Sequence, residues 1–429
     1  MSAATVGADA VSAAPLLAGL VLLALAVHPF TTYPLSLRLL ARLRPRPLAG
    51  SASPPAVSGV PPGAAPGALS GASLGGASLG TAALCVCAYN EEGVIRAKAE
   101  NMLAMRAAYP GLELLVYVDG ASDRTAEILR GYGGAIRVVE SPVRTGKTQG
   151  MNTLVGLTGA EFVAFSDANV TFAPDALPRL LAPFADPAVG CVCGHLVYTG
   201  AGGTATAATG SLYWRLEEHI KALESATGSV MGADGSIFAL RRSLHEPPPP
   251  DLIDDMYVSL AVLCAGRRIV RAGDAVAYEE AVSRPGEEWR RKIRIACQAF
   301  NVHRALRRRL RALPAVERYK YVSHKLLRWL TIYLLAAGAA CVLAGLALAQ
   351  AWAVLACVPA AVAAGLAVMA CVRRGPVAAV QDALGAFVAT GIGVWRSLRG
   401  ERFQTWNPPA SARALAGAEA QARLAGNGD

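Results

Sequence analysis

The sequence predicts an α/β domain with a mostly parallel central sheet and transmembrane helices on both sides of it. Short apolar runs alternate with helical patterns through the central region, which is typical of a parallel sheet. Long apolar runs near both ends are long enough to cross a bilayer. Hydrophobic residues make up 53% of the 429 residues and charged residues 17%, whereas soluble domains carry about 25% charge.

The first apolar run, Ala14–Phe30, carries no charged residue apart from His28 and is followed by a cluster of arginines. A signal peptide carries its positive charge before the apolar run, and arginine is enriched on the cytosolic side of a span. We therefore expect residues 1–48 to anchor the chain with its N-terminus outside. Residues 49–81 are mostly Ala, Gly, Ser and Pro, which predicts a low-complexity linker. The arginines are Arg38, Arg42, Arg44 and Arg46.

Residues 82–311 are expected to form the α/β domain in the cytosol. In such a sheet the ligand lies at the carboxyl ends of the strands. The cysteine pairs that alternate with apolar residues predict packed thiols in a reducing compartment, not disulfides or a zinc site. The predicted strands are Leu84–Ala88, Leu112–Asp119, Ile136–Glu140 and Phe162–Ser166, with helices that start near Gly93, Arg124, Lys147 and Pro174.

Residues 312–429 are expected to form a C-terminal membrane region. Two apolar runs near 326–349 and 351–372 predict spans. A third segment, 377–394, is interrupted by Asp382 and several glycines, and we expect it to lie in the interface or to re-enter. The net charge of +10 lies mainly beside apolar segments, which favours membrane lipid over nucleic acid as the partner. These features predict a multi-pass protein of the plasma membrane.

Four polar clusters follow the predicted strands. Any one of them could merely cap a helix or form a turn. Four clusters at the carboxyl edge of one sheet favour a ligand site instead. The clusters are Ala88-Tyr89-Asn90-Glu91-Glu92, Asp119 to Thr125 with Ser122 inside it, Arg144-Thr145-Gly146-Lys147, and Ser166-Asp167-Ala168-Asn169.

The Gly146-Lys147-Thr148 sequence is similar to the end of a phosphate-binding loop. That loop needs a glycine five residues before its second glycine, and this chain has Ser141 there, followed by Pro142. The motif therefore fails, which argues against a nucleoside triphosphatase.

More polar groups lie towards the C-terminal side of the domain. Gly232 to Ser236 predicts a turn that contains Gly235, and Asp254-Asp255 opens a predicted helix, where the helix dipole favours a carboxylate. The acid pair could also be a helix cap. Glu279-Glu280 ends a predicted short strand. The basic run that starts at Arg290 contains Arg291 and Arg294 and could instead be a positive face on the membrane surface.

Taken together, these motifs resemble family 2 glycosyltransferases of the GT-A (nucleotide-diphospho-sugar transferase-like) fold, in the membrane-bound branch of cellulose, chitin and hyaluronan synthases. The resemblance covers about Ala82 to Leu310. It implies a nucleotide-sugar donor. The residues it places at the donor are Ala88, Tyr89, Asn90, Glu91, Asp119, Ser122, Lys147, Asp167, Ala168 and Arg291.

The resemblance also implies a metal and a catalytic base. Asp167 and Asn169 match the family's Asp-x-Asp motif, which holds Mg²⁺ or Mn²⁺ on the diphosphate. Asp255 matches the general base, with Asp254 beside it, and Arg294 matches the arginine of the Gln-x-x-Arg-Trp motif. Gly235 and Glu280 are assigned to the acceptor side.

The chain departs from the family pattern at three points. Asn169 replaces an Asp, so one metal ligand would be a neutral carbonyl. The Gln and Trp of the last motif are missing, and the acid pair is Asp-Asp, which leaves open which acid is the base.

The resemblance implies an inverting transfer, with a UDP-sugar as the expected donor and a saccharide or lipid-linked acceptor, in polysaccharide or cell-envelope glycan synthesis. The alternative from another class is a membrane scaffold or binding protein with a degenerate glycosyltransferase domain.

Overall fold

The computed structural model describes residues 3–48, 80–199, 205–280, 285–372 and 375–405. The predicted linker therefore lies almost entirely outside the described residues. Contacts divide the chain into two compact units. We call residues 40–200, 218–282 and 404–429 the sheet unit, and residues 1–39, 201–217 and 283–403 the helical unit. Each unit is described by itself.

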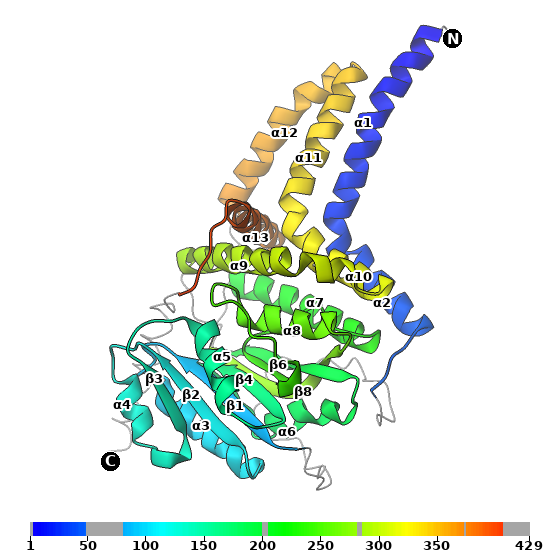
Figure 1. Cartoon of the computed structure of the whole chain (residues 1–429). Coiled ribbons are helices and arrows are strands. Elements are labelled where there is room, and N and C mark those ends of the chain that lie inside the picture. The colour runs from blue at the N-terminus through cyan, green and yellow to red at the C-terminus, as the bar shows by residue number, and fades with distance from the viewer. Residues whose placement is uncertain (1–2, 49–79, 200–204, 281–284, 373–374, 406–429) are drawn as a thin grey trace. The chain divides into compact units, whose positions relative to one another are not determined.

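The sheet unit is built on an eight-stranded sheet in the order β3-β2-β1-β4-β7-β6-β8-β5 (Figure 1). The predicted parallel arrangement is confirmed for β3-β2-β1-β4 and for β6 beside β8, while β7 and β5 run antiparallel to their neighbours. The sheet is therefore mixed. The strands are β1 (Ala82–Ala88), β2 (Glu113–Asp119), β3 (Arg137–Ser141), β4 (Phe162–Asp167), β5 (Val170–Phe172), β6 (Val189–Thr199), β7 (Ile237–Arg241) and β8 (Arg268–Glu280).

The four predicted strands are confirmed within two residues at each end, because runs of apolar side chains form the buried strands of such a sheet. The prediction that Glu279-Glu280 ends a short strand is wrong in length, since β8 has 13 residues. The helices of this unit are α3 (Ile95–Ala108), α4 (Thr125–Arg130), η2 (Gly133–Ala135), α5 (Lys147–Leu157), α6 (Ala176–Leu181), η3 (Ala182–Ala185), η4 (Arg242–Leu244) and α8 (Asp254–Cys264).

The core of the sheet unit lies around β1 and β4, which are buried along most of their length. Phe162 stacks on Phe184 with ring centroids 4.6 Å apart, and Phe165 stacks on Phe238 at 4.7 Å. These stacked rings hold β4 firmly against its neighbours. The carboxyl ends of β1, β2 and β4 consequently form a rigid edge.

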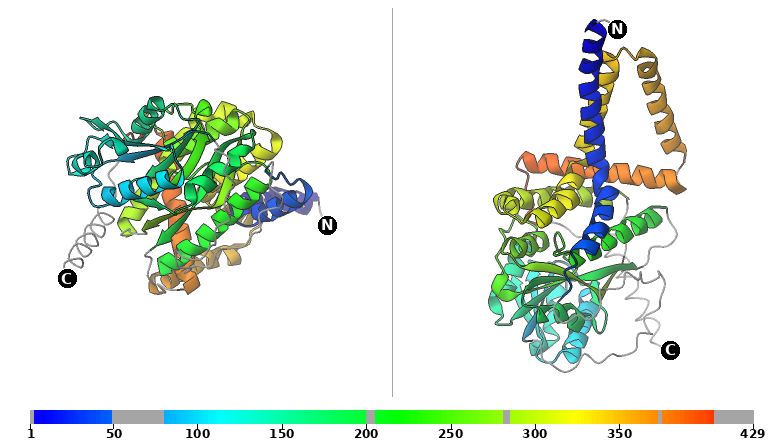
Figure 2. Two further views of the ribbon diagram at one scale, coloured as in Figure 1. Left: turned by 90° about the horizontal axis from the view of Figure 1, so that it is seen from below. Right: turned by 90° about the vertical axis from the view of Figure 1, so that its right-hand side faces the viewer.

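In the helical unit, α1 (Ala3–Val27) lies alongside α11 (Leu327–Leu348) (Figures 1 and 2). Gly19 and Gly338 let the two backbones approach, because a Cβ added at Gly19 would lie 2.9 Å from the Gly338 carbonyl oxygen. The other helices are η1 (His28–Phe30), α2 (Thr32–Leu43), α9 (Pro285–Arg311), α10 (Ala315–Tyr321), the π-helical η5 (Val322–Leu326), α12 (Trp352–Cys371) and α13 (Gly375–Leu398); α7 (Ala205–Ala226) is shared by both units.

Three helical stretches among the described residues are long and apolar enough to cross a membrane: Ala13–Phe30, Ala315–Leu348 and Trp352–Met369. They overlap the three predicted spans, although the second stretch begins at Ala315 and not near residue 326. The segment 377–394 lies in α13, which packs against α9 and runs across α11 instead of alongside it (Figure 2). Its interfacial placement stays a prediction.

Candidate active site

The first two polar clusters meet at the carboxyl ends of β1 and β2. The Asn90 side-chain amide donates to Ser122 Oγ at 3.2 Å, and the Ser122 backbone N–H donates to Asn90 Oδ1 at 2.8 Å. Thr125 Oγ1 accepts a hydrogen bond from the Glu91 backbone at 2.8 Å. Asn90 has a φ of 51°, a left-handed conformation that Asn tolerates better than most residues. These contacts lock the two strand ends together.

Asp119 ties the end of β2 to the loop before α5. One carboxylate oxygen accepts hydrogen bonds from the Thr145 backbone at 2.6 Å and from its hydroxyl at 3.0 Å, and the other accepts one from the Gly146 N–H at 3.0 Å. Gly146 has a φ of 93°, which few other residues adopt. The Arg144 guanidinium lies 3.6 Å from the centre of the Tyr89 ring. Asp119 thus holds the loop from which α5 starts, and with it the position of Lys147. The role of Asp119 in binding a nucleoside stays a prediction.

Lys147, the first residue of α5, reaches the carboxylates of two other elements. Its ammonium lies 2.6 Å from Asp167 Oδ1 at the end of β4 and 3.7 Å from Asp254 Oδ2 at the start of α8. Burial alone lowers the pKa of Lys147, but Asp167, Asp254 and Asp255 together raise it above its ordinary value. The structure therefore brings Asp167 and the acid pair together around the ammonium of Lys147.

The two adjacent acids differ in their contacts. Asp254 is buried, at 6% exposure; its Oδ2 accepts no hydrogen bond from the residues that the structure describes and has the Lys147 ammonium 3.7 Å away. Asp255 accepts a hydrogen bond from the Met256 N–H at 2.6 Å. A Cβ added at Gly235 would lie only 2.7 Å from Asp255 Oδ2. The turn before β7 therefore approaches this carboxylate through a residue without a side chain.

The protonation of Asp255 follows from this environment. Burial, with the neighbouring charges of Asp254 and Asp234, raises the pKa of Asp255 to about 7, against the opposing effect of Lys147. A carboxylate with such a pKa can accept a proton efficiently near neutral pH. The geometry therefore suits Asp255 to general-base chemistry.

The residues that match the metal motif supply hard oxygen ligands. The side chain of Asp167 is 33% exposed. The Asn169 amide nitrogen donates to Glu279 Oε1 at 3.1 Å, so the amide oxygen is the atom of this side chain that is able to hold a metal. Within the described part of the chain, no three His, Cys, Asp or Glu side chains form a metal cluster. This donor set fits a Mg²⁺ or Mn²⁺ ion that is held by one carboxylate, water and substrate phosphates.

Comparison with known proteins agrees with this arrangement. Residues 83–247 match the model of glycosyl transferase family 2. The chain carries a family 2 glycosyltransferase domain. The matched residues include β1, β2, β3, β4 and the Asp167–Asn169 turn, so the family resemblance inferred from the motifs is confirmed.

Curated N-acetylglucosaminyltransferases are similar to part of this chain. An N-acetylglucosaminyltransferase of Rhizobium sp. (strain N33) is 26% identical over 248 residues, which cover 54% of this chain and 54% of the relative. One from Rhizobium meliloti (strain 1021) is 29% identical over 187 residues, covering 39% of this chain and 44% of the relative. The chain thus spans about half the length of the curated relatives it matches.

Among solved structures, the mannosyltransferase PcManGT from Pyrobaculum calidifontis, in complex with GDP-Man and Mn²⁺, superposes with a TM-score of 0.65 and 21% identity. The match covers 90% of this chain and 99% of that chain. This likeness confirms the GT-A-like fold predicted for the glycosyltransferase domain.

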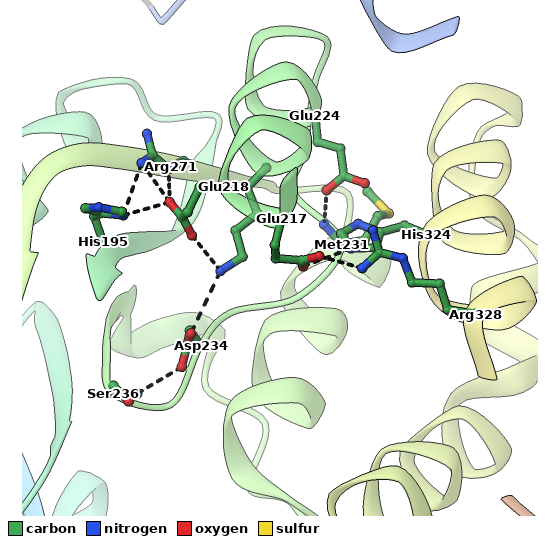
Figure 3. Close-up of polar contacts among 11 residues, drawn as sticks. His195, Glu217, Glu218, Glu224, Met231, Asp234, Ser236, Arg271, His324 and Arg328 are labelled. Carbon is green, nitrogen blue, oxygen red and sulfur yellow. Dashed lines mark hydrogen bonds and ion pairs between the residues drawn. The ribbon is translucent and has the colours of Figure 1, made fainter. Parts of the chain in front are cut away.

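A charged cluster that includes Glu218 and Arg271 lies beside the turn that carries Asp234 and Ser236 (Figure 3). Glu218 contacts His195 at 2.8 Å, Lys221 at 3.0 Å and Arg271 at 2.7 Å. Burial raises the pKa of Glu218, but these three partners lower it below its ordinary value. Lys221 also lies 3.8 Å from Asp234. The cluster therefore supports the turn that approaches Asp255.

In the helical unit, Glu217 contacts His324 at 3.0 Å and forms a short ion pair with Arg328 (Figure 3). Arg294 lies on α9, where it donates to Gln298 on the same helix at 3.0 Å. Arg291 lies 3.6 Å from Glu288, also on α9. The proposed roles of Arg291 and Arg294 at the donor stay predictions.

Sequence reasoning missed three residues of the glycosyltransferase domain. Glu279, not Glu280, contacts the Asn169 turn, and alternation along β8 could have shown which of the two side chains points that way. The sequence pattern assigns no role to Asp234 within the Gly232–Ser236 turn. It assigns none to Lys98 either, although the apolar stripe of α3 places this lysine on the buried face of that helix.

Proposed function

We propose that this protein is a membrane-anchored glycosyltransferase that moves a sugar from a nucleotide sugar to a hydroxyl group, with inversion at the anomeric carbon. The observation that carries the proposal is Asp255, a carboxylate with a pKa of about 7 within a cluster formed by Lys147, Asp167 and Asp254. A general base with such a pKa next to a cation and a metal motif suits the activation of a hydroxyl while a diphosphate departs.

In the proposed reaction Asp255 takes the proton of the acceptor hydroxyl. The acceptor oxygen forms a bond to the anomeric carbon, the bond from that carbon to the diphosphate oxygen breaks, and its electron pair leaves with the nucleoside diphosphate. Lys147 supplies positive charge beside Asp167, where the diphosphate is expected. A divalent metal held by Asp167 and Asn169 would add charge neutralisation there. Inversion itself rests on the family resemblance.

The relatives indicate which donors to test first. The curated relatives are named N-acetylglucosaminyltransferases, and PcManGT was solved with GDP-Man and Mn²⁺. We propose a UDP-sugar donor, with N-acetylglucosamine as the first sugar to test, and Mg²⁺ or Mn²⁺ as the cofactor. The proposed acceptor is a saccharide or a lipid-linked saccharide at the cytosolic face of the plasma membrane.

The three helices that can span a bilayer support a membrane-bound enzyme, and the arginines after Phe30 support a cytosolic catalytic domain. Two spans after that domain would return the chain to the cytosol. A reporter fused to the C-terminus should therefore respond from the cytosol; a response only from outside would contradict this topology.

The test of function is a donor screen with detergent-solubilised protein, Mn²⁺, and UDP-N-acetylglucosamine, UDP-glucose or GDP-mannose. Release of nucleoside diphosphate and a sized product are expected for one donor, and NMR of the product gives the anomeric configuration. Loss of turnover in Asp255→Asn shows that the activity belongs to this site.

The second candidate, a membrane scaffold with a degenerate domain, is favoured by Asn169 in the metal motif. Donor binding without transfer or hydrolysis of any nucleotide sugar would support the scaffold and overturn the enzyme.

A further inference from the structure

Beneath the Asp167–Asn169 turn lies a buried lysine that the proposed reaction does not use. Lys98 on α3 is 2% exposed. Its ammonium donates to Ser166 Oγ at 2.6 Å and to the Val170 carbonyl oxygen at 2.7 Å. Both acceptors are uncharged. Such an ammonium is expensive to bury without a carboxylate beside it, so its retention calls for a reason other than filling space.

The two acceptors bracket the candidate metal ligands. Ser166 directly precedes Asp167 in β4, and Val170 directly follows Asn169 in β5. A single ammonium therefore ties together both ends of the turn that presents these ligands. Since β4 and β5 are joined only by this short turn, its shape depends on where its two ends are held.

A second side chain of α3 continues the same attachment. Asn101, one helical turn after Lys98, donates to the Phe172 carbonyl oxygen at 2.9 Å and accepts a hydrogen bond from the Phe172 N–H at 2.9 Å. The Lys98 ammonium also lies 5.0 Å from the centre of the Phe172 ring. Two polar residues on one face of α3 thus hold Ser166, Val170 and Phe172.

Packing alone does not account for this arrangement. The neighbours of Lys98 on the buried face of α3 are Ile95, Ala99, Met102 and Met105, and a methionine at position 98 could fill similar space without desolvating a charge. The side-chain hydrogen bonds of Lys98 and Asn101 go to β4 and β5, on either side of the turn that matches the metal motif.

We propose that Lys98 and Asn101 are positioning residues, which hold the Asp167–Asn169 turn in the geometry that binds the divalent metal of the donor. The inference rests on the proposed function, because that function supplies the metal. Residues behind metal ligands typically affect metal affinity by about 10–100-fold. Lys98 acts through the backbone and Ser166, without touching metal or substrate.

The test measures Mn²⁺ binding directly, through the loss of the electron paramagnetic resonance signal of free Mn²⁺ when protein and UDP are present. In Lys98→Met we expect the Mn²⁺ dissociation constant to rise about 10-fold or more. The Mn²⁺ concentration for half-maximal transfer should rise in parallel. Asn101→Ala should shift both in the same direction by a smaller factor.

Met105→Ala is the matched control, because Met105 lies on the same helix at 1% exposure and contributes only apolar packing. It should lower the melting temperature and leave Mn²⁺ affinity within about twofold, as expected for lost packing far from the ligands. If Lys98→Met fails to fold, Ser166→Ala removes one acceptor of the same ammonium and should weaken Mn²⁺ binding in the same way.

The two proposals fail differently. Wild-type Mn²⁺ affinity in Lys98→Met or Ser166→Ala, with only a lower melting temperature, would overturn the positioning role while the proposed function stands. Wild-type protein that binds no Mn²⁺ in the presence of UDP would overturn both the metal site and this inference.

Discussion

Two lysines of the sheet unit contact neighbouring residues at the end of β4, Asp167 and Ser166, and have opposite surroundings. Lys147 lies at the strand-end edge among Asp167, Asp254 and Asp255, which raise its pKa despite burial. Lys98 lies beneath the turn with Ser166 and a backbone carbonyl as partners, and burial lowers its pKa to about 7, with only Asp167 opposing. The lysine at the strand-end edge is therefore held by ion pairs with carboxylates, and the lysine beneath it by hydrogen bonds to uncharged oxygens.

This difference separates two functions in the domain: Lys147 is placed to take part in the proposed reaction, and Lys98 is placed to support the turn. A cation among several carboxylates can exchange partners with an incoming diphosphate, because the carboxylates and the phosphates compete for it. A cation held by neutral oxygens in a closed core has no such freedom. The following predictions test this separation, from the largest expected effect to the smallest.

Replacing the proposed base should have the largest effect. Asp255→Asn keeps the size of the side chain and removes the proton acceptor, so the transfer rate should fall about 10²–10⁴-fold. Donor affinity should hardly change, because the base acts on the acceptor. The measurements are the transfer rate and the dissociation constant of the donor.

Asp254→Asn is the paired control, since it opens the same helix and lacks the proposed role. It should lower the transfer rate much less than Asp255→Asn does, because Asp254 contributes only charge beside Lys147 and Asp255. An inactive Asp254→Asn beside an active Asp255→Asn would show that the base has been assigned to the wrong acid. Near-full transfer in both variants would favour the scaffold.

Removing the shared cation should come next. Lys147→Met leaves three carboxylates close together without their ammonium, so the pKa of Asp255 should rise further above 7. Each unit by which the pKa of Asp255 rises reduces the deprotonated fraction of this base up to about tenfold at neutral pH. The rate at pH 7 should fall by about that factor and recover partly at pH 9, which a pH profile of the variant measures. A profile parallel to that of the wild type would separate Lys147 from the base.

The wild-type pH profile itself should show a limb near pH 7. Because Asp255 must be deprotonated to accept a proton and its pKa is about 7, the transfer rate should fall about fivefold from pH 7 to pH 6 and about tenfold for each further pH unit. In Asp255→Asn the residual rate should lose this limb. A limb that persists unchanged in the variant would assign the titration to another group.

The fold and much of this edge could be predicted from the sequence, because they depend on local patterns. Buried strands are runs of apolar residues, and the polar clusters follow them directly; for the same reason Asp255 could be placed at a helix start. Contacts that depend on distant pairing could not be predicted. Glu279 reaches Asn169 only because β5 pairs with β8 across more than a hundred residues.

Lys98 illustrates a second limit of the sequence. A lone lysine in a helical pattern ordinarily lies on the solvated face. The apolar stripe of α3 indicates that this lysine is inside, but only the contacts of α3 with β4 and β5 show which turn it holds. Likewise, the mixed part of the sheet depends on β7 entering antiparallel beside β4, which no local pattern specifies.

The contribution of Lys98 to the stability of the protein should depend on pH. The folded pKa of Lys98 is about 7, below that of an unfolded lysine, so the unfolded chain binds more protons between these values and the contribution of Lys98 to stability rises as pH rises from 7. The melting temperature of the wild type, relative to Lys98→Met, should therefore increase from pH 7 to pH 9. The free-energy change is at most about 2–3 kcal/mol. A constant difference would show that Lys98 is not desolvated as the structure indicates.

The smallest effect is expected where the metal motif departs from its family. Asn169→Asp restores a carboxylate ligand, and by itself this should tighten Mn²⁺ binding. The Asn169 amide, however, now donates to Glu279 at 3.1 Å, so an aspartate would place two carboxylates side by side and lose that hydrogen bond. The single variant should thus change Mn²⁺ affinity by no more than about threefold, since repulsion offsets much of the added charge.

Asn169→Asp combined with Glu279→Gln restores a donor opposite the new carboxylate and should bind Mn²⁺ more tightly than either single variant. Titration of Mn²⁺ in the presence of UDP for all three proteins measures this. If the double variant is no tighter than Glu279→Gln alone, residue 169 is not a metal ligand, and the metal site must then be assigned to Asp167 without it.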